Sequence, residues 1–302
     1  MNIWVIRPGA LGDTVLTFPL LRSIKSSVRD ADITLVGCSP YGEIVPVDFG
    51  FMPIDHPDLL WMFQSGQKIE TLKVKPCDMA YVILKNPDAV VSNLRRVGVE
   101  KILSASPIPI AGFHFVETIH AQLNLPTPPR NPMLKDPCRL WTENLLWLHP
   151  GSGGRAKLAP LKLFRALSVA FKQEIGCHIA ITLGEADSHI KFSEDWWPWL
   201  EETQAEVLEN QSLAKICERI RHARFYVGND SGISHLAAVI GVFSILFFMR
   251  TDPLQWAPWA PLDQRIIVDY RDWASGEDKP AWIKSMVDMT LNLTINNNNN
   301  TI

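Results

Sequence analysis

Small and charged residues gather where apolar strand patterns run into helical ones. The clearest case is "YVGNDSGISHLAA", Tyr226 to Ala238, in which the strand pattern ends at Asn229. The next three residues are Asp230, Ser231 and Gly232, and a helical pattern follows. Backbone N–H groups in a helix's first turn lack partners within the helix and can bind an anion, and glycine lets a ligand approach the backbone closely. The stretch predicts a pyrophosphate seat, with a plain N-cap at Asp230 or Ser231 as the structural alternative.

A second junction of this kind is "LHPGSGGRAKLAP", Leu148 to Pro160. A strand runs into a glycine-rich loop that supplies Arg155 and Lys157, two cations able to neutralise a diphosphate. The GxxxxGK[ST] pattern of a P-loop is absent. The alternative is a solvated surface loop with two ordinary cations.

A third junction, "LGEAD", places Glu185 and Asp187 after a strand. Acids at such a position commonly accept hydrogen bonds from ribose hydroxyls. The sequence leaves open which of the two would do so.

The fourth junction is "RPGALGDTVLTFPLLRSIK", Arg7 to Lys25. Its glycines form only Gly9-x-x-Gly12, so the GxGxxG fingerprint of a dinucleotide site is missing. Asp13 follows, and a carboxylate would repel a phosphate there. The structural alternative for Asp13 is an N-cap, without a capping box, because neither Glu nor Gln stands three residues on.

The alternation of strand-like and helical segments predicts the architecture that positions these junctions. Apolar runs rich in Val and Ile read as buried parallel strands, and the pattern restarts after "NLPTPPRNPMLKDP", Asn124 to Pro137, whose five prolines favour an extended linker. We expect two doubly wound α/β domains facing a cleft. Their predicted bounds are 1–137 and 138–275, followed by a helix and a disordered Asn-rich tail over 276–302.

Composition narrows the functional class. The chain has 302 residues and a net charge of −3, which gives no general affinity for nucleic acid. Its five cysteines are scattered without a CxxC pair, which favours reduced thiols over disulfides or a zinc site. We find no signal peptide and no apolar run of about 20 residues. A cytoplasmic protein is expected, with contact at the inner face of the cytoplasmic membrane left open.

Four motifs together resemble glycosyltransferase family 9, the heptosyltransferase family. They are "ALGDTVLTFPLLRSIK", "HPGSGGRAKLAP", "GNDSGISHLAA" and "TDPLQWAP", in the family's order and spanning about Met1 to Tyr270. The resemblance implies a GT-B fold of two Rossmann-like domains, with the acceptor site in the first and the nucleotide-sugar site in the second. It also implies a C-terminal helix, here Pro280–Leu293, that crosses back onto the first domain.

The resemblance also assigns roles. Asp13 matches the acid thought to be the catalytic base, in an acceptor-side loop with Gly9 and Gly12. The matches to donor-binding positions are Ser152, Lys157, Asp230, Ser231, Gly232 and His235, with Glu185 or Asp187 contacting the nucleoside. The chain departs from the family's K-x-W-P loop by carrying Ala159 in place of the tryptophan.

The resulting interpretation is an inverting, metal-independent glycosyltransferase. It would move a heptose-like sugar from a nucleoside diphosphate sugar, with ADP-heptose as one candidate, to a hydroxyl of a glycolipid or surface polysaccharide, as in lipopolysaccharide biosynthesis. No cofactor is expected, and the oligomeric state is not predicted. The main alternative is a catalytically degenerate protein of the same fold that binds a nucleotide sugar or serves as a partner subunit. A sugar-nucleotide epimerase and an NAD oxidoreductase are weaker alternatives, because their motifs are missing.

Overall fold

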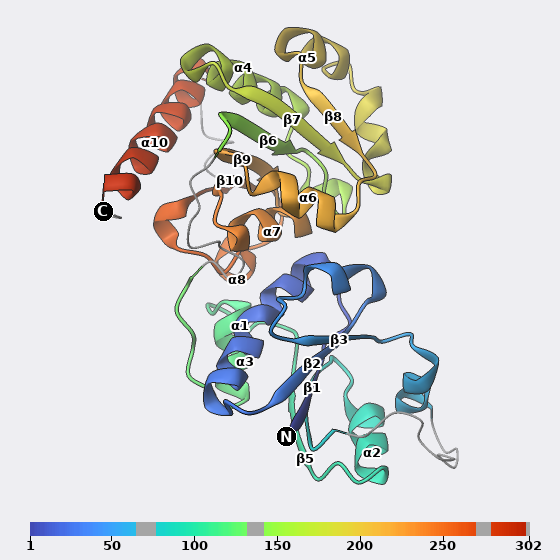
Figure 1. The fold of residues 1–302 in the computed structure, drawn as a ribbon. Helices are drawn as coiled ribbons and strands as arrows, with labels where there is room; N and C mark the ends of the chain where they lie inside the picture. Colours follow the sequence, from blue (N-terminus) through green and yellow to red (C-terminus); the bar gives the residue numbers. More distant parts are fainter. Residues whose placement is uncertain (65–76, 132–141, 270–278, 300–302) are drawn as a thin grey trace. The chain divides into compact units, whose positions relative to one another are not determined.

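The computed structural model describes residues 1–64, 77–131, 142–269 and 279–299, with residue 279 and the last five residues described by backbone alone. The chain divides into two compact units, Met1–Pro129 and Arg130–Ile302. Each unit is built around one parallel sheet with helices on both faces (Figure 1). The predicted α/β class with two doubly wound domains is therefore confirmed. The predicted boundaries at residues 137 and 275 fall outside the described residues.

The first unit contains a five-stranded sheet in the order β3-β2-β1-β4-β5. Helices α1 and α3 pack together on one face, and α2 lies with the 3-10 helix η2 on the other (Figure 1). The elements are β1 Asn2–Ile6, α1 Leu11–Ser27, β2 Asp32–Gly37, η1 Ser39–Ile44, β3 Gly50–Pro53, η2 Pro57–Phe63, β4 Met79–Ile83, α2 Asp88–Arg96, β5 Lys101–Ala105 and α3 Phe115–Gln122.

The second unit contains a six-stranded sheet in the order β11-β10-β9-β6-β7-β8. Helices α4, α5 and α10 lie on one face and α6 and α7 on the other (Figure 1). The elements are β6 Leu145–His149, η3 Arg155–Lys157, α4 Leu161–Ile175, β7 His178–Leu183, η4 Glu185–Phe192, α5 Trp196–Thr203, β8 Glu206–Glu209, α6 Leu213–Ile220, β9 Phe225–Asn229, α7 Gly232–Ile240, β10 Phe243–Phe248, α8 Pro253–Trp256, η5 Leu262–Gln264, β11 Arg265–Asp269 and α10 Lys279–Asn299.

In each sheet the chain adds strands in one direction and then restarts beside its first strand. β1 therefore has β2 on one side and β4 on the other, and β6 lies between β7 and β9. Loops that leave the carboxyl ends of such neighbours diverge to opposite faces of the sheet, which creates a crevice for a ligand. The Asp13 and Asp230 turns both begin at these points.

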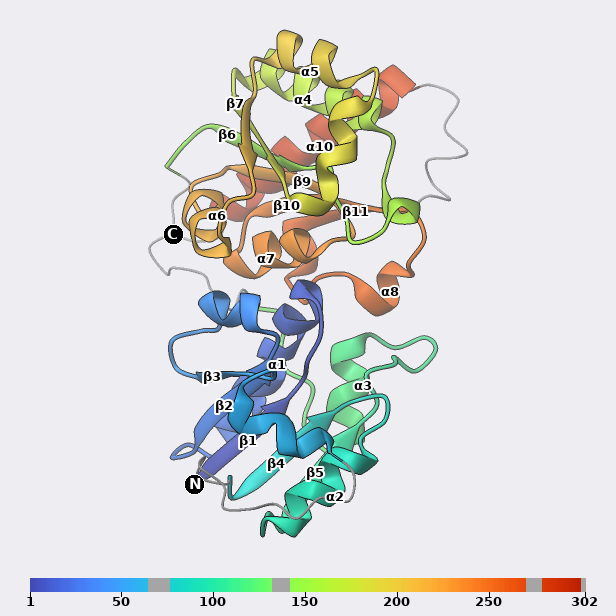
Figure 2. The same cartoon turned by 90° about the vertical axis from the view of Figure 1, so that its right-hand side faces the viewer.

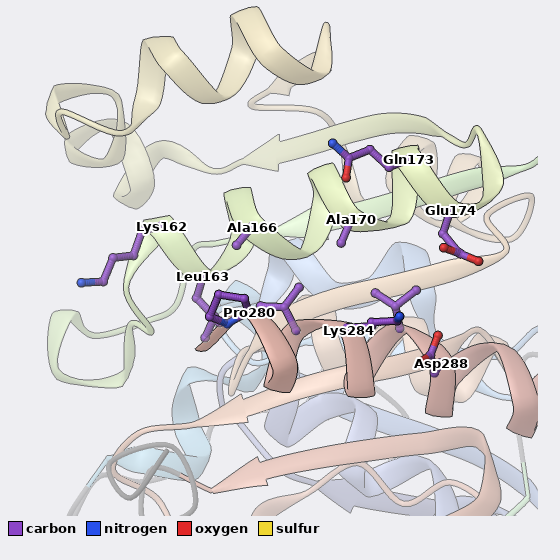
Figure 3. Close-up of a pocket in the computed structure, with 11 residues that line it drawn as sticks. Lys162, Leu163, Ala166, Ala170, Gln173, Glu174, Pro280, Lys284 and Asp288 are labelled. Atoms are coloured by element: carbon purple, nitrogen blue, oxygen red, sulfur yellow. The ribbon is translucent and has the colours of Figure 1, made fainter. Parts of the chain in front are cut away.

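Helix α10 packs against α4 within the second unit. Between the two helices lies an apolar groove of about 610 Å³ (Figure 3), and its lining includes Ala166 and Ala170 of α4 and Ile283 and Val287 of α10. None of the predicted site residues lines this groove. A crossing of this helix onto the first unit stays a prediction.

Helix α10 continues through Asn299, beyond the end near Leu293 that the sequence predicts. Once a helix is nucleated, each further residue adds one backbone hydrogen bond, so a polar segment can extend it without burying apolar side chains. The disorder expected for the Asn-rich tail stays a prediction. None of the described helices, α10 included, has the length and hydropathy to cross a membrane.

A buried imidazole joins α3 to α1 in the first unit. The Nδ1 of His120 lies 2.7 Å from the carbonyl oxygen of Val116, and its Nε2 lies 3.0 Å from the hydroxyl of Ser23. The carbonyl can only accept, so Nδ1 carries the proton and Nε2 accepts from the serine. Burial lowers the pKa of His120, and the hydrogen bond to Val116 opposes this shift. Burial therefore favours the neutral ring in the folded state.

We expect this histidine to make stability depend on pH. The unfolded chain binds a proton near the ordinary histidine pKa of about 6.5, before the folded chain does. The histidine's contribution is therefore complete above that value and declines as pH falls toward the lower folded pKa. His120→Gln should flatten the loss of melting temperature between about pH 7.5 and about pH 5.5. Burial also lowers the pKa of His149, which adds to the pH dependence in both proteins. The wild type and the variant are therefore compared directly. Equal losses of melting temperature in the two proteins would contradict the role of His120.

Candidate functional site

Asn229, the last residue of β9, ties together the loops that follow β6 and β9. Its side chain is fully buried. The Nδ2 group donates to the carbonyl of Pro150 at 2.7 Å, and Oδ1 accepts from the N–H of Ala159 at 2.9 Å. These two partners lie at either end of residues 150–160, here called the glycine loop. One amide therefore fixes both ends of that loop beside the turn at Asp230.

Asp230 connects the glycine loop to the segment that follows β10. One carboxylate oxygen accepts from the Nζ of Lys157 at 2.7 Å and from the hydroxyl of Thr251 at 2.5 Å. Its backbone carbonyl accepts from the hydroxyl of Ser152 at 2.8 Å. The structure thus brings three predicted donor residues into direct contact. Because an ammonium has three N–H donors, Lys157 keeps capacity for a further anion while Asp230 orients it.

The turn after Asp230 leaves backbone donors available. Ser231 is the N-cap of α7, and its hydroxyl accepts from the N–H of Ser234 at 3.3 Å. Within the described part of the chain, the N–H groups of Ser231, Gly232 and Ile233 donate no hydrogen bond. Ser231 can therefore cap α7 while the start of the helix binds an anion, because the capping hydrogen bond uses the N–H of Ser234. The start of α7 can accept an anion beside Lys157.

The glycine loop is open over its centre and tightly packed at its start. A Cβ added at Gly153 or Gly154 would meet no atom within 4 Å, whereas one added at Gly151 would lie 2.3 Å from the carboxylate of Asp187. Arg155 is exposed. The loop backbone is thus accessible to a ligand around residues 153–155, while residue 151 must stay a glycine for Asp187 to fit.

The two acids of the "LGEAD" junction have different environments. Asp187 is 5% exposed, and its carboxylate accepts from the N–H of Gly184 at 2.8 Å at the start of η4. Its charge raises the pKa of His149, although burial lowers that pKa more strongly. Glu185 is exposed to solvent. The structure therefore assigns Asp187 a capping contact and leaves the Glu185 carboxylate available.

His235 lies in the first turn of α7 and is 4% exposed. Its backbone N–H donates to the carbonyl of Ser231 at 3.3 Å. The imidazole is thus part of the buried side of the helix. It does not lie on the open surface of the glycine loop.

In the first unit, Asp13 occupies the third position of α1, and the N-cap is Ala10. The carboxylate Oδ2 accepts from the N–H of Ala10 at 2.9 Å, which is the acidic half of a capping box. An N-cap role for Asp13 is therefore wrong, because the helix begins three residues earlier than that role requires. Gly12 is the second residue of α1. Gly9 permits this turn, since a Cβ there would lie 2.5 Å from the Asp13 Cβ.

Sequence reasoning missed the partner of Asp13. The Nη2 of Arg7 donates to Asp13 Oδ1 at 2.6 Å, and the guanidinium stacks over Phe115 with 5.5 Å to the ring centroid. Arg7 is 7% exposed, and burial lowers its pKa while Asp13 raises it. Each Asp13 oxygen thus has one donor, so the carboxylate is held in one orientation with 28% of its side chain exposed.

The reasoning also missed Asn229 and Thr251. Both lie inside quoted motifs, Asn229 in "GNDSGISHLAA" and Thr251 in "TDPLQWAP". The sequence offered two signals for them: Asn229 is an amide residue at a strand end, and Thr251 is a hydroxyl residue after the next strand. Among the described residues, no three His, Cys, Asp or Glu side chains are grouped as metal ligands.

We predict that Asn229→Asp loosens the glycine loop. The carboxylate keeps an acceptor for Ala159 but loses the donor to Pro150, which leaves a buried carbonyl unpaired at a cost of about 1–3 kcal/mol. Trypsin should then cut after Arg155 faster than in wild type. Asn144→Asp is the control, because it removes the bond from Asn144 to the carbonyl of Ile175 at 2.7 Å, in the same unit but outside the loop. Equal cleavage rates in the two variants would contradict the assignment.

Comparison with known proteins connects these loops to one family. The model of "Glycosyltransferase family 9 (heptosyltransferase)" matches residues 127–279. "Lipooligosaccharide heptosyltransferase 2" of Campylobacter jejuni is 22% identical over 285 residues, covering 88% of this chain and 86% of that protein.

Two solved structures share the fold over nearly their whole length. The ADP-heptose LPS heptosyltransferase II of E. coli has a TM-score of 0.71 at 15% identity, covering 97% of this chain and 99% of that one. The E. coli heptosyltransferase WaaC with ADP has a TM-score of 0.70 at 14% identity, covering 96% and 100%. The expected GT-B fold is confirmed. Since the family model covers half of the chain and includes the glycine loop and the Asp230 turn, the chain belongs to glycosyltransferase family 9 and is a glycosyltransferase.

Proposed function

We propose that the chain transfers a heptose-like sugar from a nucleoside diphosphate donor to an acceptor hydroxyl with inversion at the anomeric carbon. The observation that carries this proposal is the anion seat of the second unit. Lys157 and the backbone N–H groups of Ser231, Gly232 and Ile233, which have no acceptor among the described residues, meet there at the carboxyl ends of β6 and β9. An α/β sheet commonly binds its nucleotide at such a point.

In this proposal the donor diphosphate lies between the glycine loop and the start of α7. Lys157 and the amides stabilise the charge that develops on the diphosphate as the bond to the sugar breaks. These groups supply the positive charge for departure without a metal ion. Glu185, exposed at the start of η4, accepts hydrogen bonds from the ribose. Asp187 packs against the start of the glycine loop, and Asp230 orients Lys157.

Asp13 is the proposed catalytic base. The acceptor hydroxyl oxygen attacks the anomeric carbon, its proton passes to the Asp13 carboxylate, and the carbon–oxygen bond to the diphosphate breaks. One displacement from the back face inverts the anomeric centre. The 28% exposure of the carboxylate supports this role, since its oxygens retain lone pairs beside the donors Arg7 and Ala10.

The names of the relatives suggest the substrates. One relative is a lipooligosaccharide heptosyltransferase and another is described with ADP-heptose. We propose ADP-heptose as donor and a glycolipid of the lipopolysaccharide type as acceptor, encountered at the cytoplasmic face of the membrane.

Binding of ADP tests the donor seat. ADP should raise the melting temperature more than UDP, GDP or CMP, because a ligand at about 100 times its dissociation constant adds roughly 2.7 kcal/mol of stability.

Lys157→Met should weaken ADP binding about tenfold to a hundredfold in calorimetry, from loss of a charge-assisted contact. Lys191→Met is the matched control: its ion pair with Glu209 is also 2.7 Å long and its exposure is 36% against 35%. Equal ADP affinities for the two variants would exclude the seat.

Asp13→Asn tests the base. It should lower kcat for ADP release from ADP-heptose, with a panel of glycolipid acceptors, by about 10²- to 10⁴-fold. ADP affinity should stay unchanged, because the loop that binds it belongs to the other unit. Asp48→Asn, which removes a surface ion pair with Arg22, should leave the rate as it is. Near-full turnover by folded Asp13→Asn would refute the mechanism.

Arg7→Met tests whether Arg7 orients the base. It should lower kcat while leaving ADP affinity intact, and Arg7→Lys should restore part of the rate by returning the charge. Arg22→Met is a geometric control, since Arg22 also pairs with an aspartate at 2.9 Å and stacks on Phe49 with 5.5 Å to the centroid. If Arg7→Met and Arg22→Met have the same kcat, Arg7 has no positioning role.

A further inference from the structure

An exposed arginine follows β10 and has no contact that explains it. Arg250 is open to solvent, and its side chain makes no hydrogen bond or ion pair with the described part of the chain. The next residue, Thr251, begins the motif "TDPLQWAP" and donates its hydroxyl to the carboxylate of Asp230 at 2.5 Å. Arg250 therefore lies one residue away from a group that holds the turn after β9.

The strand order of the second sheet places this arginine beside the proposed donor seat. β9 lies between β6 and β10, and both pairings are parallel, so the segments that follow these strands leave the sheet at one edge. Neighbouring strands are only about 4.8 Å apart. The segment with Arg250 therefore flanks the Asp230 turn on one side, as the glycine loop does on the other.

The alternation of side chains along β10 indicates the face of the sheet on which Arg250 lies. Successive side chains of an extended segment point to opposite faces. Four alternate residues of this segment pack in the core that α4 covers, namely Phe243, Ile245, Phe247 and Met249. Helix α7 lies on the side of the sheet opposite to α4 and α5 (Figure 2). One residue past Met249, the alternation places Arg250 on the α7 side, where the first turn of that helix begins.

The proposed donor seat needs positive charge beyond its own lysine. Lys157 is paired with Asp230 at 2.7 Å, so these two charges cancel, whereas both phosphates of a nucleoside diphosphate are negative. The exposed Arg155 supplies a cation on the glycine-loop side. Arg250 supplies one on the β10 side. A guanidinium stays protonated and can donate two parallel hydrogen bonds to a phosphate, which suits it to this position.

The proposed contacts also give the donor a direction along the sheet edge. Glu185, the proposed ribose contact, follows β7, which lies beyond β6 and away from β10. The diphosphate then extends from β6 over β9, and the phosphate farther from the ribose is the one nearer to β10. We propose that Arg250 binds this second phosphate, the one bonded to the sugar, and so selects diphosphates over monophosphates. The inference rests on the proposed function, in which charge develops on that phosphate as its bond to the sugar breaks.

Titration calorimetry of the full chain with ADP and with AMP tests the inference. Arg250→Met should weaken ADP binding about tenfold to a hundredfold, because a charge-assisted contact is lost. AMP has no second phosphate, so its affinity should equal that of wild type. Arg250→Lys should recover part of the ADP affinity by returning a point charge. Arg221→Met is the matched control, since Arg221 is also exposed but precedes β9, at the opposite edge of the sheet.

The outcomes separate this inference from the donor seat itself. If Lys157→Met weakens ADP binding and folded Arg250→Met does not, the seat stands and the role of Arg250 is refuted. Equal losses for ADP and AMP would also refute it, because the guanidinium would then contact the phosphate next to the ribose. A loss of the same size in Arg221→Met would reduce the effect to net charge and overturn the inference. If wild type bound no ADP, the seat and the role of Arg250 would fail together. Melting temperatures confirm that each variant is folded.

Discussion

The side-chain amide of Asn229 is the constraint on which the proposed donor seat depends. It lies at the end of a central strand with no exposed surface and bonds to both ends of the glycine loop. An amide suits this position because it donates and accepts at once, whereas a carboxylate or a hydroxyl cannot satisfy both partners in the same geometry. With the loop ends fixed, Ser152 and Lys157 reach Asp230, and the start of α7 is left open. The loop can therefore keep a glycine-rich, accessible centre without losing its position.

Both units place an acidic side chain at strand-to-helix turns, where it accepts a backbone hydrogen bond. Asp13 in α1, Glu117 in α3 and Asp187 in η4 each occupy the third position and accept from the backbone N–H at the start of the element. The same contact serves different ends because the surroundings differ. Asp187 is buried against Gly151, whereas Asp13 retains exposed surface and a second bond from a buried arginine. In the proposed mechanism, the chemistry at Asp13 therefore depends on Arg7 and on the exposure of the carboxylate more than on the capping contact.

Much of this structure follows from local sequence, and the remainder depends on contacts between distant residues. Apolar runs such as "LLWLH" predict the central strands because burial on both faces leaves no polar alternation. The edge strands β3, β8 and β11 were not predicted, since each is short or mixed in polarity and is defined by pairing with one neighbour. The motifs indicated Lys157 and Asp230 separately. Their ion pair, and the bond from Ala159 to Asn229, join residues 70 or more positions apart, which no local pattern encodes. The stacking of Arg7 on Phe115 is likewise a contact between distant residues. Its ion pair with Asp13 spans only six positions, but it depends on the turn that joins β1 to α1.

The Lys157–Asp230 ion pair also determines how the donor seat acts at a distance. An ammonium and a carboxylate 2.7 Å apart largely cancel beyond a Debye length of about 8–10 Å, and the chain as a whole carries a charge of −3. Under the proposed function, this pair by itself adds little long-range steering of a diphosphate, and the exposed Arg155 supplies the nearby cation of the glycine loop. Attraction to Lys157 then develops only once the anion reaches the Lys157 N–H groups that face away from Asp230, together with the amides of α7. For this pair, the lifetime of the proposed complex would depend on ionic strength more than its rate of formation does.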